Sequence, residues 1–162
     1  MKIPIKYLPH RLSKKDKKIQ LKQLKATRNA YKNKRYITRK SLDSYKSKKS
    51  SHILKAQKIY KLKNIVINSE LVNKTGCSKS ALQQIVKKGR GAYYSSGSRP
   101  NQTAQSWGYA RLASTISGGK ASAIDYKILE QGCVKNSKAL KLAIKAKQKH
   151  HNGTRKVPKV NI

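Results

Sequence analysis

Positive charge dominates this sequence so strongly that it limits how much of the chain can pack into one compact body. The 162 residues include 40 Lys and Arg against five Asp and Glu, a net charge of +35. Confining that charge in a folded domain costs self-repulsion energy unless a counter-charged partner neutralises it. A chain of this length has room for one modest domain. We therefore expect a small folded centre and a polyanionic partner.

The charge is spread unevenly. Residues 69–134 hold nine Lys and Arg against three acids, whereas residues 1–68 hold 22 against two and residues 135–162 hold nine against none. The central stretch also holds most of the glycines, both cysteines and the only tryptophan. We predict a mainly α-helical protein in three parts: a basic, partly helical N-terminal arm (1–50), a compact helical domain (51–134), and a basic C-terminal helix and tail (135–162).

The N-terminal arm contains one long helical pattern. Ser13 stands at an N-cap position with Asp16 three residues later, and helical spacing runs from Lys14 to about Lys32. Its apolar positions are sparse and its lysines repel one another, so we expect the helix to become firm only against nucleic acid or a protein. Tyrosines among the cations of residues 33–50 either stack on bases or pin the arm to the core. A short amphipathic helix is expected over 51–61.

The stretch from Asn68 to Gly89 has the pattern of a helix-turn-helix. Ser69 begins a first helix, Gly76 stops it, and Ser78 caps a second helix that Gly89 closes. In a DNA-reading pair the second helix enters the major groove with its N-terminal residues leading. The alternative is a helical hairpin with a structural role only. The candidate contacts on bases and phosphates are Ser78, Lys79, Ser80, Gln83, Gln84, Lys87 and Lys88.

Residues 89–101 have the composition of a Gly/Ser-rich loop. Such backbone can present N–H groups to an anion, and Arg90 and Arg99 flank it. We expect one of Tyr93 and Tyr94 to be buried and the other exposed. The further candidate nucleic-acid contacts are Arg90, Tyr94, Arg99, Arg111 and Lys120. We expect the side chain of Arg111 to reach toward the loop.

Three more helices are expected. The first, from Thr103 to Ser117, carries Trp107, which we predict to be the central core residue. Gly118-Gly119-Lys120 lacks the glycine and the Ser or Thr of a phosphate-binding P-loop, so it indicates a helix stop. The second runs from Ser122 to about Gln131, with Asp125 in its first turn. The third covers roughly residues 137–149, with Ile144 among its inward positions, and leads into a tail that we expect to be mobile.

Metal and catalytic chemistry have little support in the sequence. Cys77 and Cys133 are far apart and lack metal-ligand spacing, so we expect reduced thiols, no metal and no cofactor. Five carboxylates and four scattered histidines form no recognisable catalytic set, so we do not expect an enzyme. No apolar run approaches the roughly 20 residues that span a bilayer, and the N-terminus lacks the apolar centre of a signal peptide.

Several motifs carry a family resemblance: YLPHRLSKKDKK, RYITRKSLDSYKSKKSSH, TGCSKSAL and GRGAYYSSGSRPNQTAQSWGYARLAS, followed by SGGKAS and DYKILEQGC. Together they resemble a small basic protein family, a domain of unknown function, of the nucleocytoplasmic large DNA viruses (giant viruses). The resemblance implies a viral origin and a place in the virion interior or the viral factory of the host cytoplasm, or in the host nucleus. It brings no catalytic residues.

We therefore expect a non-catalytic viral protein that binds nucleic acid, DNA in preference to RNA, and coats or condenses the genome. The alternative is a minor capsid-associated protein whose basic arms contact the genome or acidic coat surfaces. In either case viral capsid or core proteins are possible further partners.

Overall fold

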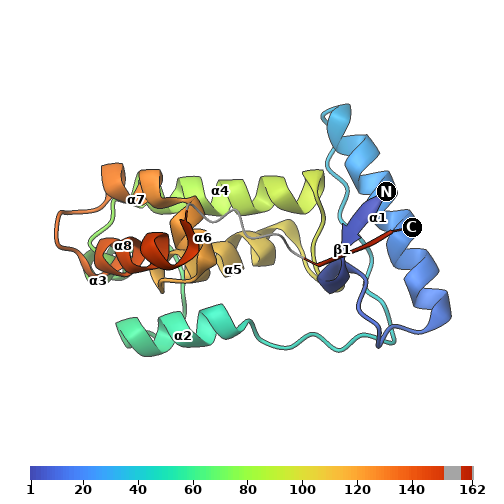
Figure 1. The fold of residues 1–162 in the computed structure, drawn as a ribbon, viewed down its shortest axis with the longest axis horizontal. Coiled ribbons are helices and arrows are strands. Elements are labelled where there is room, and N and C mark those ends of the chain that lie inside the picture. The colour runs from blue at the N-terminus through green and yellow to red at the C-terminus, as the bar shows by residue number, and fades with distance from the viewer. Residues whose placement is uncertain (152–157, 162) are drawn as a thin grey trace. The chain divides into compact units, whose positions relative to one another are not determined.

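The computed structural model describes residues 1–151 and 158–161, and it confirms a mainly helical protein (Figure 1). The described residues form eight α-helices, one short 3₁₀ helix at Ile5–Tyr7 and a two-stranded sheet. The helices are α1 (Lys14–Lys32), α2 (Ser51–Tyr60), α3 (Ser69–Thr75), α4 (Lys79–Ser95), α5 (Ala104–Ile116), α6 (Lys120–Ile124), α7 (Tyr126–Gly132) and α8 (Lys138–His150), and the strands are β1 (Lys2–Pro4) and β2 (Lys159–Asn161).

The chain divides into two compact units, each assembled from segments distant in sequence. Unit 1 comprises Met1–Lys48, Arg90–Trp107 and the strand β2, and unit 2 comprises Lys49–Gly89 and the chain from Gly108 through α8. These units do not follow the three consecutive parts that the charge distribution predicts. The difference arises because Arg90–Trp107 packs with the N-terminal residues.

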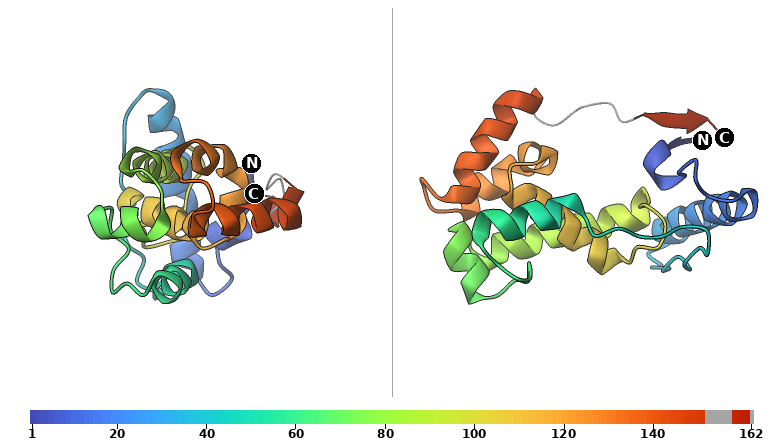
Figure 2. Two further views of the ribbon diagram at one scale, coloured as in Figure 1. Left: turned by 90° about the vertical axis from the view of Figure 1, so that its left-hand side faces the viewer. Right: turned by 90° about the horizontal axis from the view of Figure 1, so that it is seen from below.

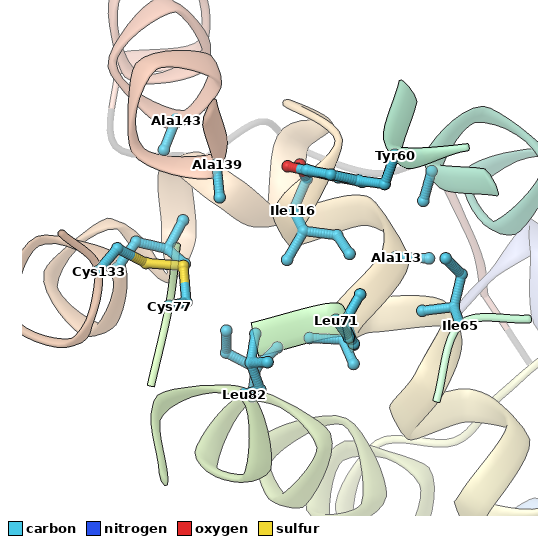
Figure 3. Close-up of a cluster of buried hydrophobic side chains, with 14 of the residues drawn as sticks. Tyr60, Ile65, Leu71, Cys77, Leu82, Ala113, Ile116, Cys133, Ala139 and Ala143 are labelled. Atoms are coloured by element: carbon cyan, nitrogen blue, oxygen red, sulfur yellow. A yellow bond between two sulfur atoms is a disulfide. The ribbon is translucent and has the colours of Figure 1, made fainter. Parts of the chain in front are cut away.

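Unit 2 has the larger hydrophobic core (Figure 3). Leu71 from α3, Leu82 from α4 and Ile116 from α5 are fully buried and point into the same cluster. Tyr60 of α2 joins them, and its hydroxyl donates a hydrogen bond to the carbonyl of Ile116. Each helix thus supplies the apolar face that its periodicity predicts, and burial of these side chains is the main stabilising contribution in the unit.

Helix α4 continues past the point where the sequence predicts its end. Gly89 lies inside the helix, because α5 crosses α4 there: a Cβ on Gly89 would lie 2.6 Å from the Cα of Gly108. The glycine is needed for a close approach of two helices and not for a stop. The expected Gly/Ser loop over 89–101 is therefore wrong for its first half, since residues up to Ser95 are helical.

The predicted helix from Ser122 to Gln131 is two helices, α6 and α7, with Asp125 at their junction. The predicted stop before it is confirmed, since Gly118 adopts a φ of +75°. Helix α8 begins as predicted after Ser137, whose hydroxyl accepts a hydrogen bond from the Leu140 backbone N–H. Ile144, predicted to face inward, is 41% exposed.

Unit 1 places the N-terminal residues against α1. Ile3, Tyr7 and Leu24 are buried together, and β1 pairs antiparallel with β2, so the two chain ends lie side by side (Figure 2). Trp107 packs against the outside of this cluster and is only half-buried, so the prediction that it is the central core residue is wrong. Tyr93 has no exposed surface, and Tyr94 is half-buried. The tail expected to be mobile lies partly outside the described residues, at 152–157.

Helix α1 begins as the sequence predicts, with the Ser13 hydroxyl accepting a hydrogen bond from the Asp16 backbone N–H. Its buried face, however, includes polar residues. Gln20 and Thr27 are almost fully buried beside Leu24, and each donates its side-chain hydrogen bond to a backbone carbonyl, that of Tyr7 or Gln23. Because their hydrogen bonds are satisfied, these polar side chains can be buried on the face of α1 that has too few apolar residues of its own.

Candidate nucleic-acid interface

The first half of α4 presents a polar stripe on one side and the core on the other. Ala81, Leu82, Ile85 and Val86 are buried. The pairs of polar residues before, between and after them recur every four positions, so they line one exposed face of the helix. Together with Ser78 just before the helix, the exposed members, all predicted as contacts, are Lys79, Ser80, Gln83, Gln84, Lys87 and Lys88. Between Lys79 and Ser95 the helix carries no acidic residue.

The turn that precedes α4 is firmly held. Gly76 takes the left-handed conformation at φ +74°, and the hydroxyl of Ser78 accepts a hydrogen bond from the Ala81 backbone N–H. The structure thus contains the two helices and the glycine turn that the sequence predicts. DNA reading by this pair stays a prediction.

The two cysteines form a disulfide, so the expectation of reduced thiols is wrong. Cys77 in the turn and Cys133 after α7 face each other in an antiparallel bridge, flanked by backbone hydrogen bonds from Ser78 N to Gly132 O and from Val134 N to Gly76 O, both 2.7 Å. The bridge fixes the start of α4 to the end of α7. The two cysteines are 56 positions apart, so the sequence carries no local signal for this pairing.

Lys88 and Arg111 form ion pairs with the buried carboxylate of Asp125. Lys88 Nζ lies 2.8 Å from Asp125 Oδ1, and Arg111 donates from Nη2 to Oδ1 at 2.8 Å and from Nε to Oδ2 at 2.9 Å. Thr115 adds a hydrogen bond to Oδ2. Arg111 therefore does not reach toward the Gly/Ser segment as expected, and Asp125 does not act as a first-turn carboxylate.

The pKa of Asp125 is lowered by this arrangement. Burial by itself raises the pKa of the carboxyl, but the hydrogen bonds and positive charges of Arg111 and Lys88 outweigh it. The carboxylate is therefore ionised at neutral pH, and the three charges form one unit. In the described part of the chain, Lys79 and Lys87 of the α4 stripe form no ion pair with an acid, so they are the stronger candidates for phosphate contacts.

Of the remaining predicted contacts, Arg90 follows Lys87 by three residues and Tyr94 follows Arg90 by four, so both continue along the same side of α4, whereas Arg99 and Lys120 lie outside this helix. Arg90, Tyr94 and Arg99 belong to unit 1, whereas Lys120, the first residue of α6, belongs to unit 2. Arg90 and Arg99 are exposed, and Tyr94 packs among other tyrosines. The predicted set is therefore divided between the two units.

Sequence reasoning missed Arg39, which is 8% exposed and has no acidic partner among the residues that the structure describes. Its guanidinium lies 3.8 Å from the centre of the Tyr93 ring and donates to the Tyr93 carbonyl at 3.0 Å and to Ser98 Oγ at 2.8 Å. Burial lowers the pKa of Arg39, and the neighbouring Tyr93 offsets part of that effect. A buried Arg held by neutral acceptors and a ring has no distinctive spacing in a sequence.

Neither a metal centre nor a spanning helix emerges from the residues that the structure describes. Within them, three or more His, Cys, Asp or Glu side chains nowhere come together as metal ligands would. None of the helices in that part of the chain has the length and apolar character needed to cross a membrane.

Comparison with known families gives one match. A model described as a family of unknown function, DUF5824, matches residues 4–131. The chain belongs to this family. The DUF5824 match covers α1 to α6 and nearly all of α7, including the α4 stripe and Asp125, and it ends before Cys133 and α8. It confirms that the chain carries a domain of unknown function. No curated protein and no solved structure matches the chain.

Proposed function

We propose that this DUF5824 protein is a non-catalytic nucleic-acid-binding protein that prefers DNA and coats or condenses a genome. Following the resemblance of its motifs, we further propose a viral origin and a place in the virion interior or viral factory. The observation that carries the proposal is uncompensated positive charge: five carboxylates face 40 Lys and Arg. A polyanion that releases condensed counterions on binding matches such a surface.

Several of the few acidic side chains interact with other groups of the folded protein, and they neutralise little of its positive charge. Asp125 is fully enclosed by its own cations, and Asp16 is 7% exposed, with its carboxylate accepting hydrogen bonds from Ser44. Glu70 pairs with Lys74 one turn along α3. Three of the five acids are thus engaged by groups of the protein itself, and the surface that a partner meets is overwhelmingly cationic.

The α4 stripe supports DNA as the preferred partner. Glutamine side chains can make two-point hydrogen bonds to adenine in the major groove, and lysines beside them suit phosphates. Gln83, Gln84 and Lys87 are exposed on one face, and the disulfide and the Ser78 cap hold the start of the helix. Duplex RNA has a deep, narrow major groove that side chains cannot read, so the stripe favours DNA.

The test is binding of the full chain to duplex DNA and duplex RNA of the same sequence, measured by fluorescence anisotropy. The variant Gln83→Ala/Gln84→Ala/Lys87→Ala removes the stripe, and Lys145→Ala/Gln148→Ala on α8 removes the same single charge from another exposed helix. We expect the stripe variant to lose about tenfold or more of its affinity for DNA, more than the α8 control, and to lose little for RNA.

Equal losses in both variants would show that α4 does not read DNA and that binding is a property of the general charge. The capsid alternative is separated by fractionating disrupted virions. A protein that stays with the shell after nuclease treatment supports the capsid role, and one released with the genome supports the coating role.

A further inference from the structure

Three tyrosines of unit 1 form an aromatic cluster that the proposal above does not use. The rings of Tyr31 and Tyr94 are nearly parallel, 7° apart, with centroids 6.5 Å apart. Tyr36 stands edge-on to both, with centroid distances of 6.1 Å to Tyr31 and 5.2 Å to Tyr94. The buried Tyr93 ring supports Tyr94 from the side at 5.1 Å. The cluster is therefore ordered by its own edge-to-face contacts.

The outer part of this cluster faces solvent. Tyr36 is 65% exposed and Tyr31 is 36% exposed, whereas Tyr93 has no exposed surface. Large aromatic rings in soluble proteins are usually well buried, so an ordered cluster with two accessible rings is informative. The rings of Tyr31 and Tyr36 therefore have surface available to a partner.

The surroundings of the cluster are basic. A shallow depression beside Tyr31 is lined by α1 residues that recur at three- and four-residue steps, namely Lys25, Arg28, Asn29 and Lys32, and by Met1 and Ser95. None of these lining residues is acidic. Arg28 is oriented by a 2.8 Å hydrogen bond from Nε to the carbonyl of Ser96. Cations in a row beside accessible rings are the combination that single-stranded nucleic-acid sites use, with phosphates on the cations and bases on the rings.

We propose that Tyr31, Tyr36 and Tyr94 form a stacking platform for unpaired nucleic-acid bases, with Lys25, Arg28 and Lys32 on the adjoining phosphates. The inference deepens the proposed function by naming single-stranded nucleic acid as a second ligand, bound by unit 1. The α4 stripe and the platform therefore have different ligands: paired bases for the stripe and unpaired bases for the platform.

The competing explanation is that the tyrosines only attach the segment after α1 to the rest of unit 1. The two explanations differ in whether the bases of the ligand matter. Stacking requires a base, whereas an anchored segment affects binding, if at all, through the placement of charges. An abasic strand keeps every phosphate and removes every base, so it separates the two.

The experiment measures binding of the full chain to a labelled oligo-dT, to an abasic strand of the same length, and to a hairpin duplex. Tyr36→Leu and Tyr31→Leu keep apolar volume but remove the ring, and Tyr36→Phe keeps the ring. We expect each leucine variant to bind oligo-dT about tenfold more weakly, within the roughly 5- to 150-fold range of aromatic stacking on one base. Binding to the abasic strand should be unchanged, and Tyr36→Phe should behave as the wild type.

Two outcomes would overturn the platform: leucine variants that bind oligo-dT as tightly as the wild type, or equal losses on oligo-dT and on the abasic strand. Circular dichroism confirms that each variant is folded, and Tyr36 tolerates substitution best because it is the most exposed of the three. Absence of hairpin binding with base-dependent oligo-dT binding intact would instead overturn the duplex part of the proposed function and leave the platform supported.

Discussion

Arg111 and Asp125 form a two-point ion pair in which the carboxylate is completely enclosed. Arg111 contacts both carboxylate oxygens at 2.8 and 2.9 Å, and the Asp125 side chain has no exposed surface. Lys88 adds a third contact, so the pair joins α4, α5 and the junction between α6 and α7. In a protein with five acids, this one holds four helices of unit 2 together.

Replacing Asp125 by Asn should therefore destabilise the protein strongly. Removal of one member of a buried ion pair leaves uncompensated charge, at a cost of about 3 kcal/mol in the free energy of unfolding. We place the value at the low end of the usual range because Lys88 and Arg111 retain some exposed surface. Urea unfolding checks it, with Glu130→Gln on exposed α7 surface as the control, which should change stability by less than about 0.5 kcal/mol.

The same pair predicts a pH dependence. Because the pKa of Asp125 in the folded protein lies below the unfolded value of about 3.9, its stabilisation is fully present above roughly pH 4 and is lost as the pH falls through the folded pKa. The difference in unfolding free energy between the wild type and Asp125→Asn should shrink as the pH falls from about 4 to about 2. A difference that stays constant over that interval would show that the carboxylate is not the titrating group.

Reduction of the disulfide should also destabilise the protein. Cross-linking residues 56 apart in sequence limits the unfolded chain, and the entropy model gives about 4 kcal/mol for a loop of this length. Guanidinium unfolding with and without a phosphine reductant measures the effect. Cys77→Ser/Cys133→Ser should match the reduced wild type and be insensitive to the reductant. Identical unfolding of oxidised and reduced wild-type protein would contradict the prediction.

Two glycines in α4 should respond in opposite directions to the same substitution. Gly89→Ala places a methyl group against the backbone of Gly108 and should cost about 1–3 kcal/mol. A Cβ on Gly91 meets nothing within 4 Å, so Gly91→Ala should stabilise the helix by about 0.5–1 kcal/mol. Thermal unfolding of the two variants is the measurement. Two neutral substitutions would be the result expected of a loop at these positions, not of a helix.

The pair of glycines also shows why the sequence predicted some boundaries and missed others. Local signals were sufficient for the start of α1 at Ser13, the stop at Gly76 and the start of α8 at Ser137, because each uses a cap within a few residues. Gly89 carries the same local signal as Gly76, but packing against Gly108 keeps it helical. A single sequence does not contain that tertiary contact.

The candidate interface follows the same rule. The exposed stripe of α4 could be predicted, since it is the complement of the apolar periodicity of Leu82, Ile85 and Val86. The ion pairs of Lys88 and Arg111 could not be predicted, because in the sequence Asp125 is 37 residues from Lys88 and 14 from Arg111. The size of Trp107 predicts a core position, but Trp107 is half-buried, and the ring without exposed surface is that of Tyr93, which accepts hydrogen bonds from Arg39.

The most direct test of the central claim is the affinity of the full chain for duplex DNA as a function of salt concentration. The account predicts measurable binding at low salt and a steep linear fall of log K with log[salt], with a slope corresponding to several phosphate contacts, about −0.9 for each. A net charge of +35 with few internal acids requires that behaviour of a nucleic-acid-binding protein. No binding at low salt, or an affinity that salt does not change, would contradict it.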